Sequence, residues 1–211
     1  MKFTILFSLF LFCGFTSYLP SATAIVVDTD GNLLRNGGTY FITPVIVTGN
    51  GGGVAFAATG NETCPLTVIQ VPSPFSNGLP IEISTPLKIL YIEEGRLVDI
   101  AFRFVAPCAA TSSRWTAVKE GVEETLSIKL AGYDNPVPGR FKIKSVTVDI
   151  GGYNLLFCPD NGSSCGYVGI QIDATGTRRL VVTQSKKGAL WIRFQRAIYA
   201  LPATASAYAS A

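Results

Sequence analysis

Residues 141–146 read Phe-Lys-Ile-Lys-Ser-Val, and their first four side chains alternate between apolar and polar. Successive side chains of a β-strand point to opposite faces, so this pattern is typical of a strand between a core and solvent. Similar runs of β-branched and aromatic residues, separated by Gly, Pro, Asn and Asp, fill most of the chain. We therefore expect further strands at 39–47, 64–71, 97–105, 127–130, 141–149, 154–157, 168–173, 180–184 and 190–195.

The spacing of these runs predicts the fold class. About eleven or twelve short strands follow one another with no helical crossover between them, which favours an all-β sandwich or barrel over an α/β fold. No linker divides the chain, so we expect one domain. The strand pattern alone leaves the choice between a sandwich and a barrel open.

The first residues predict export. A basic start is followed by an apolar run at 3–12 and by the small residues Ala22-Thr23-Ala24, as in a secretory signal peptide over 1–24. The apolar run is too short to span a membrane. We expect a mature domain at 25–199, a flexible tail at 200–211, and a secreted protein, either extracellular or vacuolar, with no membrane partner.

Composition excludes several kinds of chemistry. The 211 residues contain no histidine, which rules out a Ser-His-Asp triad, a Cys-His dyad and histidine-based zinc sites. Loss of Lys2 leaves 16 basic and 14 acidic residues, a balance too even to indicate nucleic-acid binding. The pairs Glu93-Glu94 and Glu123-Glu124 fit surface charge better than catalysis, because strand neighbours face opposite ways. We expect a protein that is not an enzyme and uses no metal or cofactor.

Cysteine number points to an oxidising compartment. Cys13 lies in the expected signal peptide, and four cysteines remain. An even number in a secreted chain predicts two disulfides with three possible pairings. The simplest pairing joins Cys158 to Cys165, which are close in sequence, and leaves Cys64 with Cys108.

Two sequons also fit a secreted chain. Asn61-Glu62-Thr63 and Asn161-Gly162-Ser163 match the acceptor pattern for N-glycosylation. Each lies beside a cysteine in a turn-like sequence. Asn61 and Asn161 are therefore candidate glycosylation sites in surface loops.

Residues 83–92, Ile-Ser-Thr-Pro-Leu-Lys-Ile-Leu-Tyr-Ile, hold a single cation among apolar neighbours. Pro86 fixes its own φ and drives Thr85 towards extended geometry, so the segment predicts a stiff loop that displays Lys88. A serine protease that cleaves after Lys or Arg would read such a loop as substrate, and a rigid scaffold would make it an inhibitor. The alternative interpretation is a β-strand whose lysine points to solvent.

Several blocks of the sequence resemble one family. The blocks are VVDTDGNLL (26–34), NGGTYFI (36–42), GNETCPLTV (60–68), LFCP (156–159) and GTRRLVV (176–182). In this order and spacing the chain resembles the plant Kunitz-type protease inhibitors, the soybean trypsin inhibitor family, over roughly residues 25–197.

The resemblance implies a β-trefoil, with twelve short strands of which six close a barrel and six cap it. It implies the disulfides Cys64–Cys108 and Cys158–Cys165. It places Lys88 in the specificity pocket of the protease, the scissile bond at Lys88–Ile89, and a support for the loop backbone at Asn36. The implied reactive-site loop consists of Ser84, Thr85, Pro86, Leu87, Lys88, Ile89 and Leu90.

The resemblance further implies a monomer whose partner is a trypsin-like serine protease. Leu87 and Leu90 depart from the bulkier or basic residues often found at these places, which bears on potency and on the preferred protease. Two other functions stay open on the sequence. One is inhibition of another protease class, such as papain-like cysteine proteases, and the other is a trefoil binding or storage protein without inhibitory activity.

Overall fold

The computed structural model describes residues 23–46, 51–64, 66–105, 108, 112–120, 125–146 and 151–197. Apart from residues 23 and 24, the expected signal peptide lies outside this range. The expected tail at 200–211 and the pair Glu123-Glu124 lie outside it as well.

The described residues form thirteen strands and one short 3₁₀ helix. Their bounds are β1 (Gly38–Pro44), β2 (Val54–Ala57), β3 (Thr67–Gln70), β4 (Ile81–Ser84), β5 (Leu97–Phe102), β6 (Trp115–Lys119), β7 (Leu126–Leu130), β8 (Pro136–Val137), β9 (Gly139–Ser145), β10 (Tyr153–Pro159), β11 (Gly166–Ile172), β12 (Arg178–Thr183), η1 (Lys186–Gly188) and β13 (Trp191–Arg196).

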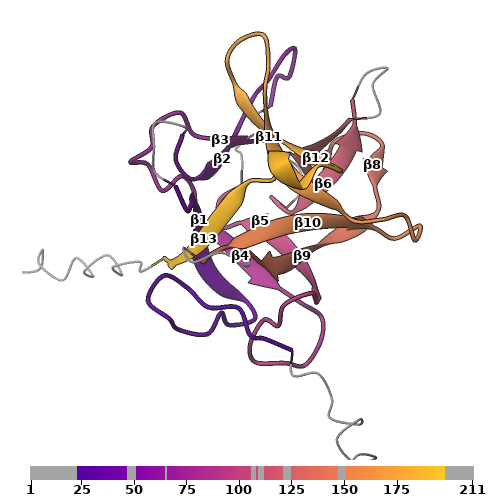
Figure 1. Ribbon diagram of the computed structural model, residues 1–211. Helices are drawn as coiled ribbons and strands as arrows, with labels where there is room; N and C mark the ends of the chain where they lie inside the picture. The colour runs from indigo at the N-terminus through magenta and orange to yellow at the C-terminus, as the bar shows by residue number, and fades with distance from the viewer. Residues whose placement is uncertain are drawn as a thin grey trace, which may run out of the picture.

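Six of these strands close a barrel. They pair in the order β13-β1-β4-β5-β9-β10, and β10 pairs back with β13, so the ring has no open edge. The hairpins β2–β3, β6–β7 and β11–β12 join one another through β3, β7 and β12 and lie above the barrel in Figure 1. Each third of the chain therefore supplies a barrel strand, a hairpin and a second barrel strand. This is the expected β-trefoil, with the two-residue β8 added beside β6.

The barrel interior follows the alternation read from the sequence. Phe141 and Ile143 of β9 are buried, whereas Lys144 is exposed. A chain of ring contacts, mostly edge-on, runs from Phe102 through Trp115 and Phe141 to Phe157, with centroids 5.4 to 6.0 Å apart. Such contacts add to the stabilisation from buried area. They make the barrel a rigid base for the loops at its ends.

Two disulfides cross-link the chain: one joins the turn before β3 to the segment after β5, and the other spans the turn between β10 and β11. Cys64 is bonded to Cys108, and Cys158 to Cys165, which is the pairing expected from the sequence. In the described part of the chain, no helix is long and apolar enough to cross a membrane.

A lysine is buried within the cap. Lys129 of β7 is 1% exposed, and its Nζ lies 2.5 Å from carboxylate oxygens of both Glu62 and Glu120. The same Nζ donates to Thr67 Oγ1 at 2.7 Å and lies 4.6 Å from the ring centroid of Tyr133. A buried charge is tolerated when it is paired and hydrogen-bonded in this way. The cluster ties the turn before β3 to β7 and to the end of β6.

This cluster makes stability depend on pH. Burial by itself raises the pKa of Glu120. Hydrogen bonds from Lys129 and Ser127, with the charges of Lys129 and Arg179, outweigh burial and hold this pKa below its usual value of 4.5. A carboxyl whose pKa is lower in the folded state stabilises the fold above its unfolded pKa, and that contribution is lost as pH falls through the folded pKa.

The variant Glu120→Gln has no carboxyl at this position to titrate. We expect the difference in free energy of unfolding between wild type and Glu120→Gln to narrow as pH falls below about 4.5. Urea unfolding of both proteins at a series of pH values measures this difference. A difference in free energy of unfolding that does not change with pH would contradict the expectation.

Candidate functional site

The segment that carries Lys88 leaves the barrel. Strand β4 ends at Ser84, residues 85–90 belong to no strand, and pairing resumes with the bridge between Tyr91 and Arg35. Lys88 is exposed, as are its neighbours Leu87 and Leu90, and Leu90 is 64% exposed. Lys88 therefore points to solvent from a loop, and the alternative of a paired strand is wrong.

Asn36 lies on the inner side of this loop. Its Nδ2 donates to three carbonyl oxygens, those of Thr85 at 3.2 Å, Leu87 at 3.3 Å and Ile89 at 3.2 Å. Its Oδ1 accepts a hydrogen bond from the backbone N–H of Thr85 at 2.8 Å. The amide nitrogen carries two N–H groups, so at least one of them is shared between two of the three carbonyls. The side chain of Asn36 thus fixes the loop backbone over five residues.

Backbone hydrogen bonds fasten both ends of the loop. The N–H of Gly37 donates to the carbonyl of Ile83 at 2.8 Å, just before the loop, and the N–H of Asn36 donates to the carbonyl of Leu90, the last residue of the loop, at 3.0 Å. Gly37 has φ near +75°, a conformation that favours glycine and turns the chain under the loop. In Figure 1 the indigo N-terminal segment lies beside this loop at the lower end of the barrel, away from the cap. Both ends of the loop are therefore attached to the same neighbouring segment.

The loop is curved at its tip. The N–H of Ile89 donates to the carbonyl of Leu87 at 2.8 Å, which closes a three-residue turn around Lys88. The loop is thus not straight, because its backbone bends around the Asn36 amide. Thr85, by contrast, is 8% exposed and anchors the start of the loop. Lys88 stands at the apex of a supported arch.

The ammonium group at this apex has no partner of opposite charge in the described ranges of the chain. Among the residues that the structure describes, Lys88 makes no ion pair, whereas Lys129 is held by two carboxylates. An unpaired cation on a fixed backbone can enter an anionic pocket of another protein without first breaking an ion pair.

The sequence did not indicate the backbone hydrogen bonds that join the chain after the loop to the N-terminal segment. The N–H of Ile92 donates to the carbonyl of Leu34, and the N–H of Val26 donates to the carbonyl of Ile92, both at 2.9 Å. Val26, Leu34 and Ile92 are fully buried. Their only local signal is an apolar residue at each place, which does not reveal what they pair with.

Comparisons with known proteins agree with this geometry. The model of the legume Kunitz family, described as "Trypsin and protease inhibitor", matches residues 26–196. The Kunitz-type trypsin inhibitor KTI1 of Glycine max is 43% identical over 204 residues, covering 93% of this chain and 97% of the relative. The chymotrypsin inhibitor ECI of Erythrina variegata is 43% identical over 164 residues, covering 75% and 89%. Soybean trypsin inhibitor in complex with porcine pancreatic trypsin superposes with a TM-score of 0.73 at 36% identity, covering 83% of this chain and all of that one.

Proposed function

Because the chain belongs to the Kunitz family of trypsin and protease inhibitors, we propose that it inhibits a trypsin-like serine protease through residues 84–90. Lys88 enters the specificity pocket of the protease, and Lys88–Ile89 is the scissile bond. The observation that carries this proposal is an exposed lysine that makes no ion pair within the described part of the chain, on a loop whose backbone Asn36 holds from inside.

The chemistry of the pocket selects the side chain. Trypsin-like pockets carry a carboxylate at their base, and lysine is a compact cation on a flexible stem that can reach it. The relatives include both trypsin and chymotrypsin inhibitors by name, so the family alone does not fix the target. A lysine at the apex of the loop favours the trypsin class.

Rigidity turns a substrate-like loop into an inhibitor. The loop is held before binding, so little conformational entropy is lost when it docks. After cleavage of Lys88–Ile89, hydrogen bonds to Asn36 and Gly37 retain both new ends. The ends stay close enough for the bond to re-form, and the product is not released. We expect an interface of standard size, about 1,600 Å² in total.

The compartment follows from the same features. Two disulfides and a chain start typical of a signal peptide support a secreted protein that works in an oxidising environment. Extracellular space and vacuole both meet this condition.

An inhibition assay of the mature protein against trypsin, chymotrypsin and papain tests the proposal. We expect tight inhibition of trypsin, with a Ki in the nanomolar range or below, about −12 kcal/mol or more negative. Inhibition of papain alone would replace the proposal with the cysteine-protease alternative. Absence of inhibition of all three would favour a binding or storage protein.

Asn36→Ala tests the support of the loop. It removes the bonds to three carbonyls and one N–H, so we expect Ki for trypsin to rise by roughly 10- to 100-fold, about 1–3 kcal/mol. Trypsin should also cleave the Lys88–Ile89 bond faster, which mass spectrometry of the incubated complex measures.

Two further variants control this measurement. Asn36→Asp keeps the shape and the acceptor for Thr85 but turns an anion towards the carbonyls, so it should weaken inhibition at least as much. Asn32→Ala removes an exposed amide from the same N-terminal segment. That amide bonds to Asp28 and not to the loop. Equal Ki values for wild type and Asn36→Ala would remove Asn36 from the mechanism.

A further inference from the structure

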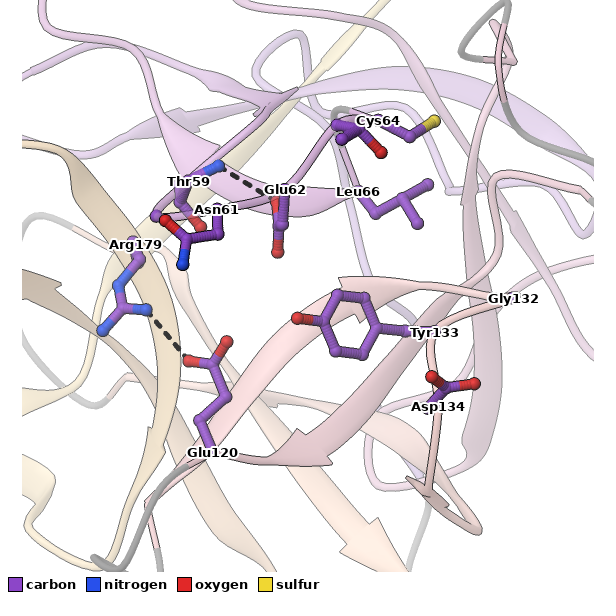
Figure 2. Close-up of a pocket in the computed structure, with 12 residues that line it drawn as sticks. Thr59, Asn61, Glu62, Cys64, Leu66, Glu120, Gly132, Tyr133, Asp134 and Arg179 are labelled. Atoms are coloured by element: carbon purple, nitrogen blue, oxygen red, sulfur yellow. Dashed lines mark hydrogen bonds and ion pairs between the residues drawn. The ribbon is translucent and has the colours of Figure 1, made fainter.

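A second feature of the surface lies among the loops of the cap. A pocket of about 510 Å³ opens between the turn at 59–64, the turn at 132–134, Glu120 and Arg179 (Figure 2). This volume is within the range of small-ligand pockets. None of its lining residues belongs to the loop at 84–90 or to the segment that supports it. The pocket is thus separate from the proposed inhibitory site.

Asn61, the acceptor of the first sequon, stands on the rim of this pocket. The turn that carries it is closed by the N–H of Glu62, which donates to the carbonyl of Thr59 at 3.1 Å. The side chain of Glu62 turns inward to Lys129 and to the N–H of Thr59. Because the middle residue of the sequon is held inside, Asn61 and Thr63 on either side of it are exposed. The buried ion cluster thus holds the residue next to Asn61 in place.

Tyr133 forms the opposite side of the pocket. One face of its ring lies 4.6 Å from the Nζ of Lys129, which orients the ring. In Figure 2 the hydroxyl of Tyr133 points into the space lined by Asn61, Glu120 and Arg179, and the amide of Asn61 lies on the Arg179 side of that space. An aromatic ring can pack against the C–H face of a sugar. The carboxylate and guanidinium groups beside it can hydrogen-bond the sugar hydroxyls.

We propose that Asn61 carries an N-linked glycan whose first two N-acetylglucosamine units fold back into this pocket against Tyr133. In the transfer, Nδ2 of Asn61 forms a bond to the anomeric carbon of the first sugar. The bond from that carbon to the oxygen of a lipid-linked pyrophosphate breaks. The pyrophosphate leaves with the electron pair, and the amide loses one proton to a base of the transferase. The proposal rests on entry into the secretory pathway and not on protease inhibition.

Asn161 provides an internal comparison. It lies in the short loop closed by Cys158 and Cys165, and its Oδ1 accepts from the N–H of Ser163 at 3.0 Å. Asn161 does not line the pocket beside Tyr133. A glycan on Asn161 therefore lacks the contact that we assign to the glycan on Asn61.

The test uses the full precursor expressed in a eukaryotic host that glycosylates sequons, together with Asn61→Gln, Tyr133→Ala and Tyr133→Phe. Peptide mapping by mass spectrometry gives occupancy, and timed digestion with a peptide N-glycosidase gives the release rate at each site. We expect Asn61 to be occupied and its glycan to be released at least tenfold more slowly from native than from denatured protein. Tyr133→Ala should abolish this protection, Tyr133→Phe should keep it, and a glycan on Asn161 should show none.

Hydrogen exchange gives a readout that does not depend on folding of Tyr133→Ala. Backbone amides at 132–134 should exchange more slowly in the glycosylated protein than in Asn61→Gln. An unmodified Asn61, equal release from native and denatured protein, unchanged protection in a folded Tyr133→Ala, or equal exchange at 132–134 would each overturn the proposal. Trypsin inhibition is measured on the same samples. Asn61→Gln should inhibit as wild type does, so failure of either proposal is seen separately.

Discussion

Trypsin inhibition is expected to fall by roughly 10²- to 10⁴-fold in Lys88→Glu, because an anion then faces the carboxylate of the protease pocket. Removing one partner of a buried, hydrogen-bonded charge pair costs about 2–5 kcal/mol, and charge reversal adds repulsion. Lys88 is exposed and has no charged partner among the described residues. The substitution should therefore leave the free energy of unfolding within about 0.5 kcal/mol of wild type. The measurements are Ki for trypsin and a urea unfolding curve.

Two variants separate the position of the charge from its presence. Lys186→Glu makes the same change in the exposed helix η1, outside the loop, and should inhibit as wild type does. Lys88→Arg keeps a cation at the apex and should retain inhibition within about tenfold. If Lys88→Glu inhibits trypsin as strongly as Lys186→Glu, the protease binds another part of the surface, and the proposed scissile bond is wrong.

The strands were predictable from the sequence where one face of the strand is buried and the other is exposed to solvent. Residues Phe141 to Lys144 of β9 alternate in sequence and in burial, because β9 lies in the barrel wall. The closure of the barrel was not predictable from such patterns. It depends on the pairing of β10 with β13, where Tyr153 lies opposite Ile192, and nothing local in either strand specifies that partner. The resemblance to the Kunitz family supplied the trefoil that periodicity could not.

Two cap strands had no clear pattern. Strand β2 is only four residues long, and β6 buries Trp115, Ala117 and Val118, so neither alternates over enough residues to stand out. Each is fixed by pairing with the next strand of its hairpin rather than by its own sequence. Short strands of this kind depend on tertiary contacts, which a single sequence does not display.

Only part of the candidate site was predictable, because the rest depends on contacts between residues far apart in the sequence. An isolated Lys88 after Pro86 indicates a displayed cation, but the contacts of Asn36 join residues about fifty positions apart. Alternation also misleads at β7, where Ser127 and Lys129 belong on the polar face and yet are both 1% exposed. The turn that contains Glu62 covers that face and supplies the opposite charge. A buried polar residue is recognised only when the segment that packs over it is known.

Lys129→Met is expected to cost about 3–5 kcal/mol of unfolding free energy, because it leaves buried carboxylate oxygens without their cation. Glu62 is 9% exposed and loses its ion pair, while Glu120 keeps its contacts with Arg179 and Ser127. Methionine fills most of the lysine volume, so loss of packing contributes little. Urea unfolding with intact disulfides measures the change. Lys119→Met, at the exposed end of β6, is the matched control and should stay within about 0.5 kcal/mol of wild type.

A triple variant distinguishes uncompensated charge from lost structure. Adding Glu62→Leu and Glu120→Gln to Lys129→Met removes the anions together with the cation, and replacing a buried ion pair by apolar groups is often close to neutral. We therefore expect the triple variant to recover at least about half of the loss. A loss below about 1 kcal/mol in Lys129→Met would show that the carboxylates find other partners or water. Among the described residues, the hydrogen bonds and ion pairs of the cluster do not reach the loop at 84–90, so Ki for trypsin should stay constant in every variant that remains folded. A parallel loss of inhibition and stability would instead mean that the cap and the loop unfold as one unit.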